Sequence, residues 1–94
     1  MNKYESVIII NPNLEDAKIK ALVEKFSKLV NEHGKLEKVE DMGKKKLVYP
    51  IAKNTEAFYE VLYFEAESAF VAELERVYRI TDEVLKFIVV KVEE

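Results

Sequence analysis

The apolar residues between Leu14 and Gly34 recur at the spacing of an α-helix, and this stripe constrains the fold more than any other feature. They fall at i, i+3, i+4, i+7, i+10 and i+11, which places them on one face of a helix. Asn13 is suited to cap the first turn, and Gly34 to end the helix in the left-handed conformation. We therefore predict a helix from about Leu14 to about His33. Its apolar face is Ile19, Leu22, Val23, Phe26, Leu29 and Val30.

A second helical stripe follows Ser68, which we expect to act as its N-terminal cap. The apolar positions recur at i, i+4, i+7 and i+8, and they are Phe70, Leu74, Val77 and Tyr78. Arg76 and Arg79 come in the last turns, where cations favour the negative end of the helix dipole. The spacing predicts a second, shorter amphipathic helix.

Four further segments are rich in β-branched and aromatic residues, and we predict a strand in each of them. Met42-Gly43 interrupts the second strand, and Pro50 cannot donate to a hydrogen-bond ladder, so this strand is expected at an edge of the sheet. Turn signals end the first strand and separate the second from the third. The strands are Tyr4–Ile10, Leu36–Ile51, Ala57–Glu65 and Leu85–Val92; the turns are Asn11-Pro12-Asn13 and Lys53-Asn54-Thr55.

The predicted elements follow one another in the order β-α-β-β-α-β. This order is typical of an α+β, ferredoxin-like split β-α-β sandwich, in which a four-stranded antiparallel sheet carries two helices on one face. Strands one and three should lie in the middle of the sheet. Because 94 residues are too few to bury two separate cores, we expect a single domain over residues 1–94.

Period-two alternation assigns the third strand's side chains to the two faces of the sheet. Phe58, Leu62 and Phe64 should face the helices, while Tyr59, Val61 and Tyr63 should face outward with apolar residues of the neighbouring strands. An exposed apolar surface usually marks a contact site. Tyr59, Val61 and Tyr63 are therefore candidate partner-binding residues. The alternative is that they are ordinary strand formers covered by loops or by self-association.

The compact basic feature of the chain is the run Lys44-Lys45-Lys46. The formal net charge of −3 argues against binding nucleic acid by overall attraction, so any such binding must use a local patch. The run can contact phosphates, or it can protect an edge strand from pairing with other chains. Further basic residues near the ends of elements extend it to a candidate RNA-binding rim: Lys3, Lys53, Arg79 and Lys86.

Residues that carry out catalysis are scarce in this chain. It has no cysteine and a single histidine, His33, which we expect to satisfy a carbonyl at the end of the first helix. No glycine-rich loop is present to hold a phosphate. We predict no catalytic residue, metal site or cofactor. With no apolar run long enough to span a membrane, we expect a cytoplasmic location.

The order of short motifs along the chain resembles the bacterial small-subunit ribosomal protein six family. The likeness runs from Tyr4-Glu5 and Asn11-Pro12-Asn13-Leu14, through Gly34 and Glu37–Glu40, to the signature-like Gly43–Lys53, and on to Glu73–Arg76, Arg79–Asp82 and Val89–Lys91. The resemblance implies a ferredoxin-like fold and a place in the small ribosomal subunit. It also implies binding to small-subunit (16S) ribosomal RNA together with ribosomal protein eighteen, without a small-molecule substrate.

Other proteins share the expected topology, so the fold alone does not decide the function. An RNA-recognition module needs base-stacking aromatics in a motif that Ala57–Val61 lacks, and an acylphosphatase needs a phosphate loop that Asn11-Pro12-Asn13 cannot form. A small-molecule-binding regulatory domain of ferredoxin-like fold remains the alternative hypothesis.

Overall fold

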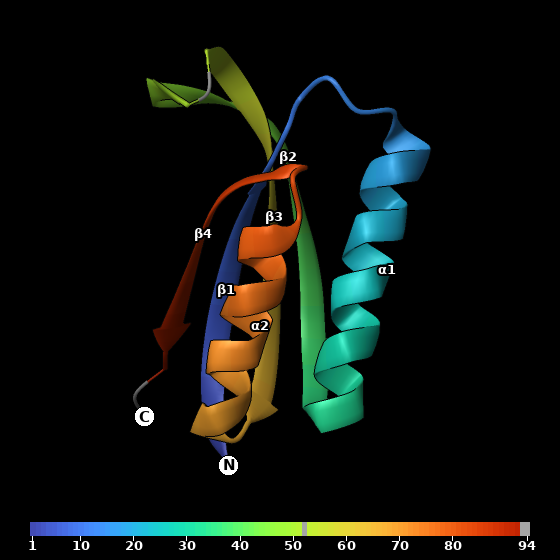
Figure 1. The fold of residues 1–94 in the computed structure, drawn as a ribbon, viewed down its shortest axis with the longest axis vertical. Helices are drawn as coiled ribbons and strands as arrows, with labels where there is room; N and C mark the ends of the chain where they lie inside the picture. The colour runs from blue at the N-terminus through green and yellow to red at the C-terminus, as the bar shows by residue number, and fades with distance from the viewer. Residues whose placement is uncertain (52, 93–94) are drawn as a thin grey trace.

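The structure, a computed structural model, describes residues 1–51 and 53–92. Its elements are β1 (Asn2–Ile10), α1 (Asp16–His33), β2 (Gly34–Ile51), β3 (Asn54–Ala66), α2 (Ser68–Ile80) and β4 (Val84–Lys91). The strands form one sheet in the order β2-β3-β1-β4, and every neighbouring pair is antiparallel. Both helices lie on the same side of the sheet (Figure 1). The predicted ferredoxin-like sandwich and its central strands are confirmed.

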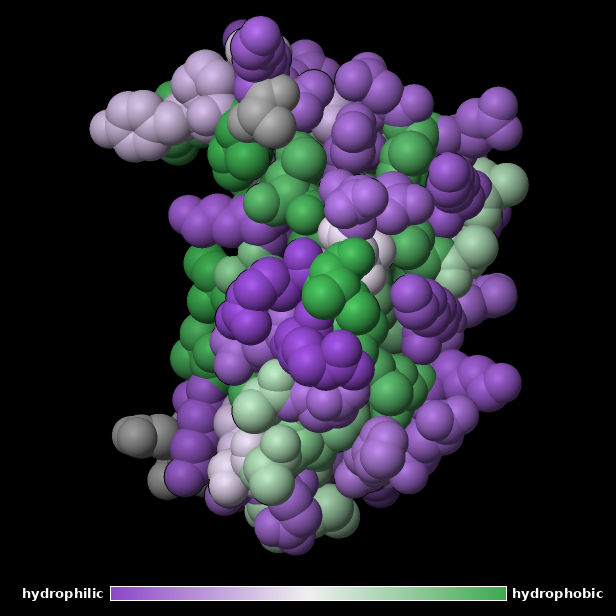
Figure 2. Space-filling view, in the orientation of Figure 1, coloured by the Kyte–Doolittle hydropathy of each residue, from purple (hydrophilic) through white to green (hydrophobic). Residues whose placement is uncertain are grey.

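The hydrophobic core lies between the helices and the sheet. Phe26 of α1 and Tyr78 of α2 meet edge to face with ring centroids 4.8 Å apart, and Phe64 of β3 contacts the ring of Phe70. Complete burial of each large apolar side chain stabilises the fold by roughly 1.5–3 kcal/mol. The large apolar side chains buried almost completely are Ile8, Ile10, Phe26, Val30, Leu62, Phe64, Leu74 and Tyr78. The outer surface of this side is mostly hydrophilic, with apolar patches between (Figure 2).

The starts of both helices differ from the prediction. Helix α1 begins at Asp16 rather than Leu14, because the backbone N–H of Asn13 donates to the side chain of Asn11 at 2.9 Å and so belongs to a turn. Ser68 is the first residue of α2 and not its cap. Glu15 and Glu67 hold the cap positions without a side-chain cap bond, so both predicted caps were wrong.

The helix end at Gly34 was also predicted wrongly. Gly34 has φ −168° and ψ −145°, an extended backbone, and is the first residue of β2, paired with Ala66. A Cβ atom at this position would overlap the carbonyl oxygen of Glu65. Glycine is therefore needed for the close approach of two strands. His33, expected to reach a carbonyl, instead stacks on Phe70 with ring centroids 5.0 Å apart.

Strand β2 lies at the edge of the sheet, as Pro50 predicted, and it is interrupted where the sequence indicated. Gly43 has φ +73°, in the left-handed region, and the pairing register with β3 shifts between Asp41 and Gly43. The Asp41 side chain accepts a hydrogen bond from the Gly43 backbone N–H at 2.8 Å. The interruption is thus a bulge within a continuous strand.

The hairpin of β2 and β3 extends past the rest of the sheet (Figure 1). Strand β1 ends at Ile10, which pairs with Phe58, whereas β3 begins at Asn54 and pairs there with β2 alone. The third strand is therefore longer than the predicted Ala57–Glu65, and Lys53 forms the turn with φ +67°. The tip of this hairpin projects from the domain without cover from a third strand.

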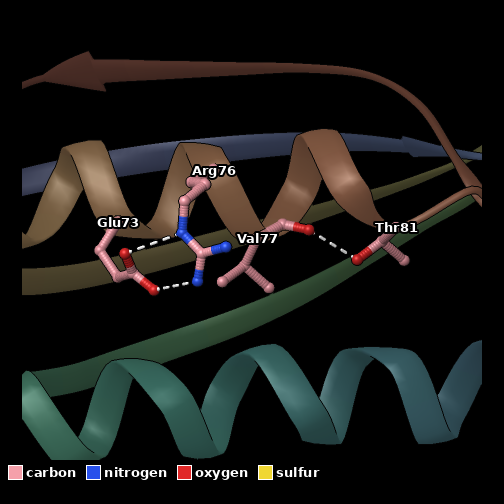
Figure 3. A network of polar contacts seen from close by, with 4 residues as sticks. All are labelled: Glu73, Arg76, Val77 and Thr81. Atoms are coloured by element: carbon pink, nitrogen blue, oxygen red, sulfur yellow. Dashed lines mark hydrogen bonds and ion pairs between the residues drawn. The ribbon is translucent and has the colours of Figure 1, made fainter.

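Two sets of polar contacts lie along α2, one between side chains on its surface and one at its C-terminal end (Figure 3). Arg76 donates two hydrogen bonds to the Glu73 carboxylate, at 3.0 and 2.6 Å, and this contact lowers the pKa of Glu73. The Thr81 hydroxyl donates to the Val77 carbonyl at 2.6 Å, and the Thr81 N–H bonds to the Tyr78 carbonyl. These bonds satisfy carbonyls of the last turn and end the helix.

Candidate nucleic-acid and partner interface

The three consecutive lysines lie in β2 at the base of the projecting hairpin, and all three are exposed. Lys44 pairs with Phe58, Lys45 with Ala57 and Lys46 with Glu56. Because side chains alternate along a strand, Lys45 points to the face opposite Lys44 and Lys46. The ammonium group of Lys44 lies 5.3 Å from the centroid of the Phe58 ring. The run therefore offers positive charge on both faces of the hairpin.

Three of the other basic candidates lie at the same end of the domain. Lys53 is exposed at the hairpin turn. Arg79 is exposed in the last turn of α2, with its guanidinium 5.8 Å from the Phe87 ring centroid. Lys86 is exposed near the start of β4 and pairs with Ile9, close to the end of β1. Six of the seven candidate RNA-binding residues thus share one end of the domain.

Lys3 is the exception, because it lies near the beginning of β1, at the other end of the sheet. It pairs with Glu65 across the strands, and its ammonium group lies 4.0 Å from that carboxylate. Lys3 is therefore not a neighbour of the lysine run, although the sequence analysis placed both in one rim.

The facing predicted for Tyr59, Val61 and Tyr63 is confirmed. They pair with Ile9, Val7 and Glu5 of β1. None of these residues belongs to the core between the helices and the sheet, so their side chains lie on the face that carries no helix. Val61 is only 8% exposed and is shielded by its neighbours, whereas Tyr59 and Tyr63 are half-buried. The two tyrosine rings are accessible to a partner, and Val61 lies largely beneath the surface between them.

Tyr63 is held in place by two residues of the edge strand. Its hydroxyl donates a hydrogen bond to the Glu40 carboxylate at 2.9 Å, and this bond, with partial burial, raises the pKa of Tyr63. The ammonium group of Lys38 lies 5.6 Å from the centroid of the same ring. Tyr63 therefore presents an oriented ring to the open face.

The most exposed apolar side chains of this face lie on β4. Ile88 is 47% exposed and Val90 is 51% exposed, and they pair with Val7 and Glu5 of β1. The accessible apolar surface therefore continues from the tyrosines of β3 across β1 to the opposite edge of the sheet. We call the surface formed by Tyr59, Tyr63, Val7, Ile88 and Val90 the open-face patch.

The sequence reasoning missed two residues at the hairpin tip. Val48 is 89% exposed and Tyr49 is 79% exposed, the largest exposures among the big apolar side chains of the described chain. The register places Lys46 opposite Glu56 and Ile51 opposite Asn54, so Leu47–Pro50 stand opposite Thr55 alone. The loss of alternation around Pro50 was the available signal for this bulge.

A carboxyl pair on the helix side was also missed. A cavity of about 410 Å³ lies between α1 and the sheet, and Glu60 of β3 and Asp41 of β2 meet in its wall. Burial, followed by the proximity of Asp41, raises the pKa of Glu60 to about 7. Lys20 of α1 lines the same cavity. Strict alternation with Phe58 and Leu62 would have placed Glu60 inward.

The described chain offers no cluster of side chains that could act as a metal centre. Across residues 1–51 and 53–92, no group of three or more histidine, cysteine, aspartate or glutamate side chains is arranged to hold a metal ion. None of the helices in this part of the chain is long and apolar enough to cross a membrane. Fold and surface together define a ferredoxin-like α+β domain with an open apolar face and a basic hairpin.

Comparison with known proteins gives the family. Residues 3–91 match the family described as Ribosomal protein S6. The chain is 43% identical to the small ribosomal subunit protein bS6 of Clostridium novyi, with all of both chains covered, and 41% identical to that of Heliobacterium modesticaldum, with 100% and 99% covered. The chain belongs to the ribosomal protein S6 family.

A solved relative agrees in structure. The crystal structure of 30S ribosomal protein S6 from Thermotoga maritima superposes with a TM-score of 0.92 at 38% identity, covering 97% of this chain and 87% of that one. The family and the fold expected from the sequence are both confirmed.

Proposed function

We propose that this chain is a structural component of the small ribosomal subunit, located at the ribosome in the cytoplasm, and that it binds small-subunit ribosomal RNA together with ribosomal protein eighteen. The observation that carries the proposal is membership of a family whose relatives are named small ribosomal subunit proteins. This membership favours the ribosomal role over a small-molecule-binding regulatory domain.

The RNA contact in this proposal is the basic hairpin. Four lysines and one glutamate between residues 44 and 56 give this segment a net charge of +3, within a chain of net charge −3. RNA phosphates bind lysine by local attraction with release of counterions. Arg79 and Lys86 extend the positive region at the same end, whereas Lys3 would require RNA that reaches the opposite end of the sheet.

The contact with protein eighteen in this proposal is the open-face patch. Its tyrosine rings and apolar β4 side chains form the kind of surface that dominates protein contacts. No helix covers this side, so a partner can lie on it without any rearrangement of the core. The RNA and the partner protein would then occupy separate surfaces of the domain.

The test of the proposal measures the affinity of the protein for small-subunit ribosomal RNA in the presence of protein eighteen over a range of salt concentrations. Replacement of Lys44, Lys45 and Lys46 by alanine should weaken binding and flatten the slope of log K against log salt by about 0.7–0.9 per lost phosphate contact. The matched control replaces Lys20, Lys25 and Lys28 of α1, which makes the same change in net charge on the helix layer.

If the control variant loses as much affinity and slope as the hairpin variant, the hairpin is not the contact site. If the unchanged protein fails to bind the RNA with its partner, or does not sediment with the small subunit from a lysate, the ribosomal role itself is wrong.

A further inference from the structure

The tip of the β2–β3 hairpin presents an aromatic ring to solvent at the most basic point of the chain. Tyr49 is 79% exposed, and among the described residues no other aromatic ring packs against it. A tyrosine ring carries a large apolar area that is usually covered in a folded protein. Together with the neighbouring Val48, which is 89% exposed, the ring gives the hairpin an apolar tip that is accessible to a ligand.

The backbone of the hairpin explains why the ring points outward. Leu47–Pro50 stand opposite the single residue Thr55, so the longer strand arches away from its partner. Bulges of this kind redirect side chains, and Pro50 restricts the backbone directly after Tyr49. The strand pairs Lys46–Glu56 and Ile51–Asn54 hold both ends of the arch. Tyr49 therefore lies in an arched segment whose two ends are held by strand pairing.

The charges around the arch identify the chemistry of the ligand. Lys45 and Lys46 precede it and Lys53 follows it, and all three are exposed. A protein partner that covered the ring would have to match this concentration of positive charge. A nucleic acid matches both the positive charge and the exposed ring, since its phosphates attract the lysines and its bases offer flat apolar faces.

We propose that Tyr49 stacks on an unpaired base of the RNA, with the hairpin lysines on the flanking phosphates. This inference rests on the proposed RNA-binding function and narrows it to single-stranded or bulged nucleotides, because bases in a helix have no free face for a side chain. Tyr49 supplies the preference for unpaired nucleotides, and the lysines supply the salt-dependent attraction.

The experiment compares variants of the full chain for binding to small-subunit ribosomal RNA with protein eighteen present. Tyr49→Leu keeps an apolar side chain but removes the aromatic face, and should weaken binding about 5- to 150-fold, the range for loss of one stacked base. The salt slope should stay unchanged, since no phosphate contact is lost. Tyr49→Phe should bind like the unchanged protein. Circular dichroism of each variant confirms that the exposed substitution leaves the fold intact.

A second readout detects the stacking directly. The chain contains no tryptophan, so Tyr49→Trp introduces a single indole whose fluorescence reports on this position. Titration with RNA that contains the unpaired nucleotides should quench the indole fluorescence. A fully paired duplex of the same length should leave the fluorescence intensity unchanged.

The outcomes separate this inference from the function on which it rests. If Tyr49→Leu binds RNA with unchanged affinity, or if the duplex quenches the indole equally, base stacking is refuted while RNA binding stands. If Tyr49→Leu instead weakens association with protein eighteen in the absence of RNA, the ring docks on protein and the inference is wrong. If the unchanged protein has no affinity for the RNA, both proposals fall together.

Discussion

The hydroxyl groups of Ser6 and Tyr78 lie 2.8 Å apart in the interior of the domain, joining the central strand β1 to helix α2. Both residues are completely buried. Burial raises the pKa of the Tyr78 phenol, so its hydroxyl keeps its proton at every physiological pH. The pair links α2 to the sheet, and each hydroxyl satisfies the hydrogen-bonding capacity of the other.

Removal of both members of this pair should cost less than the sum of the two single removals. We expect Tyr78→Phe to lower the free energy of unfolding by about 1–3 kcal/mol, since it leaves the Ser6 hydroxyl buried without a partner. Ser6→Ala should lower the free energy of unfolding for the same reason, since it leaves the Tyr78 hydroxyl buried without a partner. The double variant should lose less than the sum of the two single losses, as measured by urea denaturation. Strict additivity would show that the two hydroxyls do not interact.

Glu60 should make the protein less stable as the pH rises. Its folded pKa of about 7 lies above the ordinary value of 4.5, so the folded state holds the proton more tightly than the unfolded chain. The stabilisation is complete below pH 4.5 and is lost as the pH rises through 7. Between these values the slope for one proton cannot exceed about 1.4 kcal/mol per pH unit.

Urea denaturation at several pH values between 5 and 8 tests whether the stability falls as the pH rises. Glu60→Gln should remove the slope and raise the stability at pH 8, because a neutral amide replaces a buried charge that faces Asp41. Glu73→Gln is the matched control, since Glu73 is paired with Arg76 at the surface and its pKa is lowered. An unchanged slope in Glu60→Gln would assign the pH dependence to other groups.

Gly34→Ala should destabilise the fold by more than 1 kcal/mol, because the added methyl group meets the Glu65 backbone and forces β2 and β3 apart. Gly43→Asn is the comparison, since nothing lies within 4 Å of the position of its Cβ and asparagine tolerates a positive φ. Thermal unfolding of both variants provides the measurement. Equal losses would mean that local backbone conformation, rather than strand contact, governs both sites.

The open-face patch should contribute to partner binding more than to stability. Replacing Tyr59 and Tyr63 with serine should weaken association with protein eighteen, with losses of about 2 kcal/mol or more if they are central to the contact. Phe64→Ala, on the helix side, should instead cost about 3–5 kcal/mol of folding stability. Calorimetric titration and urea denaturation measure the two effects.

A further variant separates the two roles of Tyr63. Tyr63→Phe keeps the ring and removes only the hydrogen bond to Glu40. It should retain partner affinity if the ring forms the contact. If the serine pair proves as destabilising as Phe64→Ala, the tyrosines serve the fold rather than the partner.

The features that repeat along the chain could be predicted from the sequence. The stripe from Ile19 to Val30 predicted α1, and period-two alternation in β3 predicted which side Tyr59 and Phe64 would face. Pro50 predicted the edge position of β2. Each of these depends on the spacing of residues within one element, and that spacing follows from helix and strand geometry.

The features that depend on two distant segments could not be predicted. Gly34 has the residue type of a helix terminator, but its role is set by Glu65, which approaches it across the sheet. The exposure of Tyr49 follows from a register between β2 and β3 that neither strand specifies alone. Asn13 failed as a cap because its backbone N–H bonds to the Asn11 side chain in a turn, and Ser68 failed because α2 already begins at that residue, with Glu67 before it.

The central position of β1 has a consequence for synthesis of the chain. Its run Val7–Ile10 is made among the first residues, yet its neighbours β3 and β4 come much later, and β4 pairs with it last in chain order. At about 5–20 residues per second, translation of the 73 residues between Ile10 and Val84 takes about 4–15 seconds. Until β3 is made this apolar strand has no partner, and until β4 is made one of its edges stays unpaired. We therefore expect the nascent chain to be sheltered by the exit tunnel or by a chaperone before the sheet can close.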